Sequence, residues 1–332
     1  MALDIPHQHS HRHLRDRLGI QDSKDGQAGG RRGSFDIPAA VSFTMGLLLL
    51  LVGVTWGLLY SWRDSTTIAA LVLSPAFFVA FAIWEDRYSV DPILDFDFFR
   101  NRVFTFSIMA AMLQFVALFS VNFLLIFYLE GITGLSALTA SYLIIPFAVA
   151  NATLGPIGGL LSDKFGFRSV SAVGTLVLLG ALLLFSQLTV STTLLQIGGI
   201  EAASGIGLAF FWPANTSAIM SSTPPARYGV GSGAMNTFRN TGMVLSFALS
   251  LTAATSVIPT GVVYELFIGN LSGRLPPSLA ISYLSGQRFA FEISAALLAV
   301  AFVFVLIAGG RPPREARPSP QVPPEEAPAP DA

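Results

Sequence analysis

The chain has 332 residues, of which 52% are hydrophobic and only 12% are charged, and its formal net charge is −1. Soluble domains carry about 25% charged residues, so this composition argues against a soluble globular protein and indicates that lipid surrounds most of the chain. The sequence contains no cysteine, which excludes disulfides, thiolate chemistry and metal sites built on cysteine.

Eight apolar runs are long enough to cross a bilayer, whose core of about 30 Å needs about 20 apolar residues in a helix. Helices are expected because a helix satisfies its own backbone hydrogen bonds in lipid. The sequence therefore predicts an all-α integral membrane protein with eight transmembrane helices. The runs are Pro38–Tyr60, Thr67–Trp84, Phe104–Leu129, Ala137–Leu161, Ser169–Leu188, Thr193–Ser217, Tyr228–Val257 and Phe289–Ile307.

Lys and Arg residues are distributed unevenly between the two sides that these eight runs define. They concentrate in the N-terminal segment, in every second connection and in the C-terminal tail, whereas the alternate connections hold only Arg63, Arg274 and Arg288. Loops rich in Lys and Arg face the cytoplasm. We therefore expect a multi-pass protein of the cell membrane with both termini in the cytoplasm.

A short charged turn joins the fourth and fifth runs and has a specific spacing. Its residues of interest are Gly159, Asp163, Lys164, Gly166 and Arg168. Gly166 supplies a turn position that can adopt a positive φ, and Lys164 or Arg168 could pair with Asp163. An ordinary positive-inside turn would need only the charges, whereas the pattern G-x-x-x-D-K-x-G-x-R is more particular.

This pattern resembles the signature loop of the major facilitator superfamily, G-x-x-x-D-R/K-x-G-x-R/K-R/K, with Ser169 at its last basic position. The stretch PILDFDFFRNRVF (Pro92–Phe104) is similar to the amphipathic linker of the fourteen-span drug:proton antiporters of that superfamily. The stretch GVGSGAMNTFRNTGMVLSFAL (Gly229–Leu249) is similar to their penultimate helix.

The resemblance implies how the chain is divided. Antiporters of this family have two six-helix halves separated by two extra helices, and the chain matches the extra helices and the C-terminal half. The N-terminal half is expected to be absent. The implied parts are a disordered cytoplasmic segment (1–37), two extra transmembrane helices (38–84), an amphipathic cytoplasmic linker (85–103), the six-helix C-terminal half (104–309) and a disordered Pro-rich cytoplasmic tail (310–332).

Glu201 is the main candidate for a working group within a span, because ionisable residues in a bilayer are costly and usually functional. It shares a helical face with Ser204 and Asn215, and such a face should point toward protein or water rather than lipid. Glu201 could be a proton or cation site, or a structural carboxyl that hydrogen-bonds between helices. The sequence leaves both interpretations open.

Four other polar residues within spans are candidates for lining a cavity: Gln114, Asn122, Asn236 and Arg239. For Arg239 a packing anchor is favoured over a functional role. Gln114 and Asn122 are of a kind that holds helices together more often than it contacts a ligand.

The resemblance implies proton-coupled multidrug efflux by alternating access around a midplane site. The expected partners are the lipid bilayer, protons, small amphipathic or cationic compounds, and a separate N-terminal half or a second copy of the chain. The alternative is a non-transporting membrane subunit or a truncated remnant of such a transporter. Because no nucleotide-binding, nucleophile or metal-binding motif is present, we expect no enzymatic activity, no cofactor, no metal and no nucleic-acid partner.

Overall fold

The computed structural model describes residues 36–87, 96–255 and 275–309, and the regular elements within these residues are all helices. Seven helical segments among them are long and apolar enough to cross a membrane. They are α2 (Ile37–Leu59), α3 (Ser65–Arg87), α4 (Arg102–Phe127) continued by the π-helical turn η2 (Tyr128–Ile132), α5 (Ala137–Tyr142) with α6 (Ile145–Phe165), α7 (Phe167–Phe185), α8 (Leu194–Ser221) and α11 (Pro277–Ala308).

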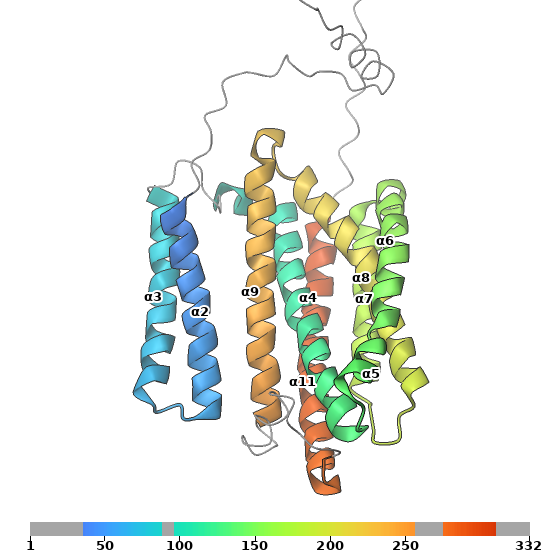
Figure 1. Cartoon of the computed structure of the whole chain (residues 1–332). Coiled ribbons are helices and arrows are strands. Elements are labelled where there is room, and N and C mark those ends of the chain that lie inside the picture. Colours follow the sequence, from blue (N-terminus) through green and yellow to red (C-terminus); the bar gives the residue numbers. More distant parts are fainter. Residues whose placement is uncertain (1–35, 88–95, 256–274, 310–332) are drawn as a thin grey trace, which may run out of the picture. The chain divides into compact units, whose positions relative to one another are not determined.

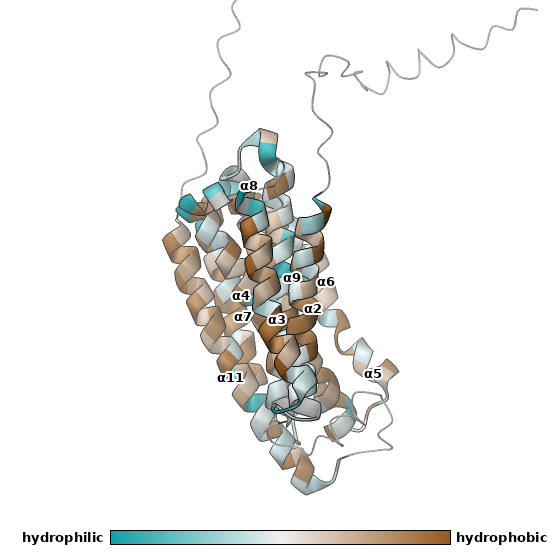
Figure 2. Ribbon diagram, turned by 90° about the vertical axis from the view of Figure 1, so that its left-hand side faces the viewer, coloured by the Kyte–Doolittle hydropathy of each residue, from teal (hydrophilic) through white to brown (hydrophobic). Residues whose placement is uncertain are grey.

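An eighth helix, α9 (Tyr228–Thr255), has 28 residues and is long enough to span a bilayer, although it is less apolar than the other seven. Its lower hydropathy comes from the Gly, Ser, Asn and Arg residues of its first half. Figure 2 shows hydrophobic residues along the middle of the helices and hydrophilic residues toward their ends. The predicted class, an all-α membrane protein with eight membrane-length helices, is confirmed.

The helices of residues 102–308 pack around α4 and α8. Helix α8 packs against both α6 and α7, and α4 packs against both α9 and α11 and also contacts α8. Helices α2 and α3 pack against each other, and α2 contacts α9. The α6–α7 junction at Gly166 and the α8–α9 connection lie at one end, which we name the Gly166 end, and the α7–α8 connection lies at the opposite end (Figure 1).

Close contact between these helices depends on glycine. A Cβ atom on Gly158 of α6 would clash with the Ala209 carbonyl of α8, and a Cβ on Gly205 of α8 would clash with the Phe147 carbonyl of α6. A Cβ on Gly174 of α7 would lie 2.6 Å from the Gly207 carbonyl of α8. Small residues let helix backbones approach closely in membranes, so these glycines fix α8 between α6 and α7.

The predicted span Ala137–Leu161 lies within one membrane-length segment, Ala137–Phe165, which the structure divides into α5 and α6. Pro146 explains the division. A proline has no N–H for the carbonyl four residues earlier, and its ring crowds that carbonyl, which here belongs to Tyr142, the last residue of α5. Pro146 instead lies in the first turn of α6, where a missing N–H is tolerated.

The last helix begins earlier than its predicted start at Phe289. Helix α11 has 32 residues and starts at Pro277, because its first turns pack against α4 and η2 although their sequence is not strongly apolar. The buried Tyr283 hydroxyl donates to the Leu124 carbonyl at 2.6 Å, and the Leu275 N–H donates to the Gly131 carbonyl at 2.7 Å. Tertiary contacts therefore extend the helix beyond the apolar run.

Part of the predicted linker 85–103 is a short 3-10 helix, η1 (Phe96–Arg100), while residues 88–95 lie outside the described residues. The rings of Phe98 and Phe99 pack edge-on against Phe104 of α4, with centroids 5.2 and 5.6 Å apart. The Thr105 hydroxyl donates to the Phe99 carbonyl at 2.8 Å. These contacts hold η1 against the start of α4. Most of the predicted terminal segments, 1–35 and 310–332, also lies outside the described residues.

We predict that Gly158→Ala lowers the free energy of unfolding, by about 1–3 kcal/mol, because overpacking forces two backbones apart. Gly155→Ala on the same helix is the matched control, since nothing lies within 4 Å of its Cβ position. Thermal unfolding of the purified chain in detergent measures both variants. Equal midpoints for the two variants would contradict the close approach of α6 and α8.

Candidate functional site

Glu201 lies inside the protein on the predicted polar face of α8. Its side chain is 1% exposed, and Ser204 and Asn215 on the same face are also buried. The Asn215 amide donates to the Ser107 carbonyl of α4 at 3.2 Å, so it connects two helices. The Ser204 hydroxyl donates within its own helix, to Ile200 at 3.1 Å. The expectation that this face points away from lipid is met by all three residues.

The carboxyl of Glu201 has no hydrogen bond or ion pair with any described residue, and its buried Oε1 atom is unsatisfied. Its neighbours along α8 are Ile197, which belongs to the main hydrophobic cluster, and Gly205, which packs on the backbone of α6. An ionised carboxylate without a partner is strongly disfavoured in apolar surroundings. The structure therefore does not provide the interhelical hydrogen bond that a purely structural carboxyl would make.

Arg239 lies in the middle of α9 and faces aromatic side chains of two other helices. Its guanidinium carbon is 5.9 Å from the ring centroid of Phe115 in α4 and 5.9 Å from that of Trp212 in α8. The two rings are nearly perpendicular, at 82°, with centroids 5.3 Å apart. We name Arg239, Phe115 and Trp212 the aromatic–arginine cluster. The Gly242 backbone packs against Met112 and Phe115 one turn further along α9, which brings α9 close to α4.

The side of α9 next to Arg239 is polar and partly exposed. Ser232 and Asn236 are half-buried and Asn240 is exposed, at successive i, i+4 positions that share one helical face. The Asn236 amide donates to the Ser232 carbonyl at 3.0 Å. On α4, Asn122 is half-buried, and Phe119 is 38% exposed next to Phe115. Partly exposed polar groups of α9 and α4, together with the ring of Phe119, therefore lie within about two helical turns of the cluster along their helices.

Gln114 does not fit its predicted role of holding helices together. It is 1% exposed, and neither its amide nitrogen nor its side-chain oxygen has a hydrogen-bond partner among the described residues. Buried polar groups are normally hydrogen-bonded. No hydrogen bond links Gln114 to Glu201 or Arg239.

The predicted site residues form two groups rather than one. Trp212, which contacts Arg239, lies about 16 Å further along α8 than Glu201, given the rise per residue of an α-helix. Glu201 lies nearer to the α7–α8 connection, and the aromatic–arginine cluster lies nearer to the Gly166 end. Glu201 is therefore not the counter-ion of Arg239.

The predicted signature turn is shorter than the sequence suggests, because α6 ends at Phe165 and α7 begins at Phe167. Gly166 alone separates them, with a φ of 84°, which confirms the expected positive φ. Asp163, Lys164 and Arg168 are exposed, and no ion pair joins them in the part of the chain that the structure describes. Lys164 lies over the Phe165 ring instead, 5.3 Å from its centroid.

The second glycine of the turn pattern, Gly159, is not at a tight contact. The nearest atom to its Cβ position is 3.9 Å away, in Pro213 of α8. The close approach of the helices therefore depends on Gly158, which is outside the pattern.

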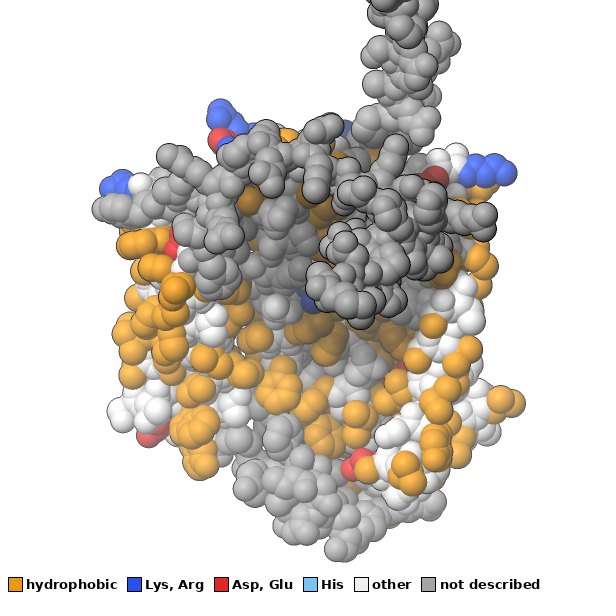
Figure 3. Space-filling model, turned by 45° about the horizontal axis from the view of Figure 1, so that its top comes forward, with side chains coloured by type: hydrophobic (Ala, Val, Ile, Leu, Met, Phe, Trp, Pro, Cys, Tyr) orange, Lys and Arg blue, Asp and Glu red, His pale blue; other side chains and the backbone are white. Residues whose placement is uncertain are grey.

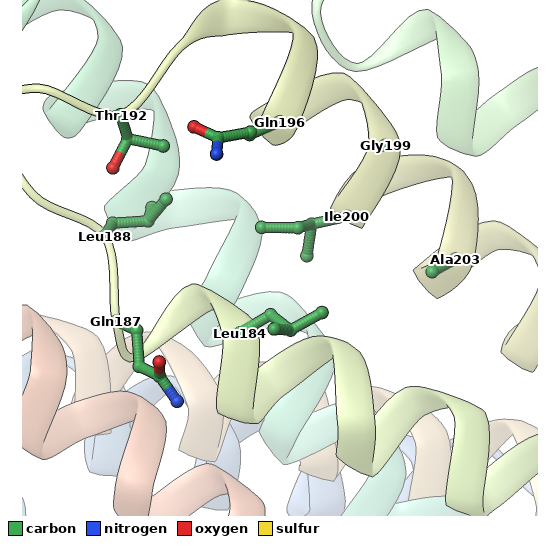
Figure 4. A pocket seen from close by; sticks show the side chains of 8 residues that line it. All are labelled: Leu184, Gln187, Leu188, Thr192, Gln196, Gly199, Ile200 and Ala203. Carbon is green, nitrogen blue, oxygen red and sulfur yellow. The ribbon is translucent and has the colours of Figure 1, made fainter.

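One open pocket of about 380 Å³ lies between the end of α7 and the start of α8 (Figure 4). It contains none of the predicted site residues, and no sequence pattern indicated it. In the part of the chain that the structure describes, no cluster of three or more His, Asp or Glu residues could hold a metal ion. The pocket is lined by Leu184, Gln187, Leu188, Thr192, Gln196, Gly199, Ile200 and Ala203.

Comparison with known proteins gives a consistent picture. The family model described as Major Facilitator Superfamily matches residues 32–247. The uncharacterised MFS-type transporter YhcA of Bacillus subtilis is 29% identical over 67% of this chain and 41% of its own length. The multidrug transporter protein MdtP of Bacillus subtilis is 24% identical over 82% of this chain and 58% of its own length.

The lincomycin resistance protein LmrB of Listeria monocytogenes is 25% identical over 69% of this chain and 47% of its own length. Among solved structures, a bacterial homologue of the human lysosomal transporter Spinster matches with 19% identity and a TM-score of 0.49, over 80% of this chain and 64% of that one. The chain spans about half the length of the curated relatives that it matches. Because the family model covers well over half of its residues, this chain belongs to the Major Facilitator Superfamily, a family of transporters and not of enzymes.

Proposed function

We propose that this chain is the C-terminal half of a proton-coupled efflux transporter for small amphipathic compounds. One observation carries the proposal: α4, α8 and α9 place polar and aromatic groups near mid-membrane depth on a surface that is only partly covered. Arg239, Asn236 and Asn240 would be costly against lipid. They are suited to a water-filled cavity of the kind that lies between the two halves of such transporters.

The relatives support export of amphipathic compounds. MdtP is named as a multidrug transporter and LmrB as a lincomycin resistance protein. In this chain, the rings of Phe115, Phe119 and Trp212 lie beside the polar groups of α9. A pocket that combines aromatic walls with a few polar groups suits drug-sized ligands.

The second half of the cavity requires further helices. The relatives that this chain matches are about twice as long as the matched region, which supports a complete transporter with another six-helix half. That half could precede this chain on a longer polypeptide, could be a separate polypeptide, or could be replaced by a second copy. A non-transporting membrane subunit or a truncated remnant remains the alternative function.

The distribution of charge supports an orientation in the cell membrane with the Gly166 end in the cytoplasm. Figure 3 shows most Lys and Arg side chains of the visible face at the upper rim, above hydrophobic flanks. Arg100, Lys164, Arg168 and Arg227 lie at the Gly166 end, in connections or next to them. Positively charged connections favour the cytoplasmic side, and both termini would then be cytoplasmic.

We propose that Glu201 carries the coupled proton. In the complete transporter, Glu201→Gln should abolish transport driven by a pH gradient, and Glu201→Asp should retain part of it, because the enclosed carboxyl is the group that would load and release a proton. Glu292→Gln is the matched control, because Glu292 is an exposed carboxyl that accepts a hydrogen bond from Arg288 at 2.9 Å.

The measurement is proton flux in vesicles when a panel of amphipathic compounds is added. Full coupling in Glu201→Gln, with normal protein levels, would assign the proton to another group and leave Glu201 with a structural role.

The half-transporter proposal also predicts that this chain by itself confers no drug resistance. Expressed alone in a drug-sensitive host, it should give the same growth-inhibiting concentrations as an empty vector, because half of the central cavity is absent. Resistance from the chain alone, with purified protein that transports in vesicles, would contradict this and would indicate an assembly of two copies.

A further inference from the structure

Arg239 is a cation whose charge is not matched by the described part of the chain. It lies about 17 Å along α9 from Tyr228, given the rise per residue of an α-helix, and is therefore near the middle of a bilayer. No described residue forms an ion pair or accepts a hydrogen bond from it, and its buried Nε atom is unsatisfied. A charged group at this depth is normally paired.

The two aromatic rings account for only part of what a guanidinium can bind. The rings of Phe115 and Trp212, each 5.9 Å from the guanidinium carbon, can attract the cation through their faces. Arginine also has five N–H donors in the plane of its guanidinium, and none of them has an acceptor among the described residues. The cluster therefore orients a planar donor group and leaves its hydrogen-bonding edge unused.

The surroundings favour an anion that arrives from outside the described chain. Glu201 is too far away to pair with Arg239, as shown above. Asn236 and Asn240, on the partly exposed side of α9 next to Arg239, can supply further amide donors. Phe119 is 38% exposed and continues the aromatic surface from Phe115.

We propose that the aromatic–arginine cluster is a recognition site for the anionic group of an aromatic compound, such as a carboxylate or sulfonate attached to a ring system. The guanidinium binds the anion through its N–H edge, and the ring system packs against Phe119 and the aromatic surface beside it. A planar guanidinium binds such anions through two parallel hydrogen bonds, which an ammonium cannot reproduce. The inference rests on the proposed function in one respect only, namely that the anion belongs to a transported compound. The binding itself requires only this chain.

A carboxylate of another six-helix half could also supply the anion that pairs with Arg239. Assembly of the transporter distinguishes this carboxylate from a bound compound. A ligand site stays open when the transporter is assembled. A carboxylate from the other half would fill the site on assembly.

The probe is 1-anilinonaphthalene-8-sulfonate, and the matched neutral compound is N-phenyl-1-naphthylamine, which has the same rings without the sulfonate. The chain is placed in lipid nanodiscs with Trp56, Trp62 and Trp84 replaced by Phe, so that Trp212 is the only tryptophan. Energy transfer from Trp212 to the probe then reports binding at the cluster. We expect saturable binding of the sulfonate that is at least roughly tenfold tighter than binding of the neutral compound, as a charge-assisted hydrogen bond implies.

The variant Arg239→Gln should weaken sulfonate binding to the level of the neutral compound, and Arg239→Lys should give an intermediate affinity. Arg288→Gln is the matched control and should change neither affinity, because Arg288 is exposed in the first half of α11 and paired with Glu292. Circular dichroism and the thermal midpoint establish whether each variant is folded.

If the unmodified chain binds the sulfonate and the neutral compound with equal affinity, the proposal is overturned. This outcome does not depend on whether any variant of Arg239 folds. Unchanged sulfonate binding in folded Arg239→Gln would also overturn the proposal. Loss of the sulfonate site when the chain is assembled with another six-helix half would overturn the ligand role and assign Arg239 to an ion pair between halves. Because none of these titrations measures transport, their failure is distinct from failure of the proposed efflux function.

Discussion

The close backbone contact of α8 with α6 and α7 is the constraint on which the remaining geometry depends. Gly158, Gly205, Gly174 and Gly207 remove the side chains that would separate these helices, and in lipid such packing takes over part of the role that hydrophobic burial has in water. With α8 held between two neighbours, its rotation is fixed. One face of α8 then points Glu201, Trp212 and Asn215 toward the inside of the bundle, where Asn215 bonds to α4.

This arrangement places the carboxyl of Glu201 and the aromatic–arginine cluster at different positions along α8. Glu201 is enclosed, without a charged or hydrogen-bonding partner among the described residues, and suits a group that exchanges a proton rather than one that binds an ion permanently. Trp212, about 16 Å further along α8, belongs to a partly exposed cluster in which the guanidinium of Arg239 has no hydrogen-bond acceptor among the described residues. In the proposed transporter, proton and substrate would therefore be bound at different depths, and their coupling would require a conformational change that reaches both sites rather than competition for one carboxyl.

Local sequence features predicted the helical class, the eight membrane-length helices, the polar face of α8 and the positive φ of Gly166, because each depends on composition or on one helical period. The early start of α11 could not be predicted, since Tyr283 and Leu275 are held by contacts with residues far away in the chain. Pro146 indicates the break between α5 and α6, but the apolar run around this proline favoured the prediction of one uninterrupted span. The partners of Arg239 depend on packing between α4, α8 and α9, which one sequence does not reveal. The same holds for Gln114, whose side chain has no hydrogen-bond partner among the described residues.

The central claim is that the side of α9 beside Arg239 faces a water-filled cavity rather than lipid, and cysteine accessibility tests it most directly because the chain has no cysteine of its own. Asn240→Cys and Leu176→Cys, both exposed and at similar depth from the Gly166 end, are treated in native membranes with a membrane-impermeant, charged thiosulfonate. The account predicts rapid modification of Asn240→Cys and no modification of Leu176→Cys on the exposed surface of α7. Equal rates at the two positions, or an unreactive cysteine at position 240, would contradict it.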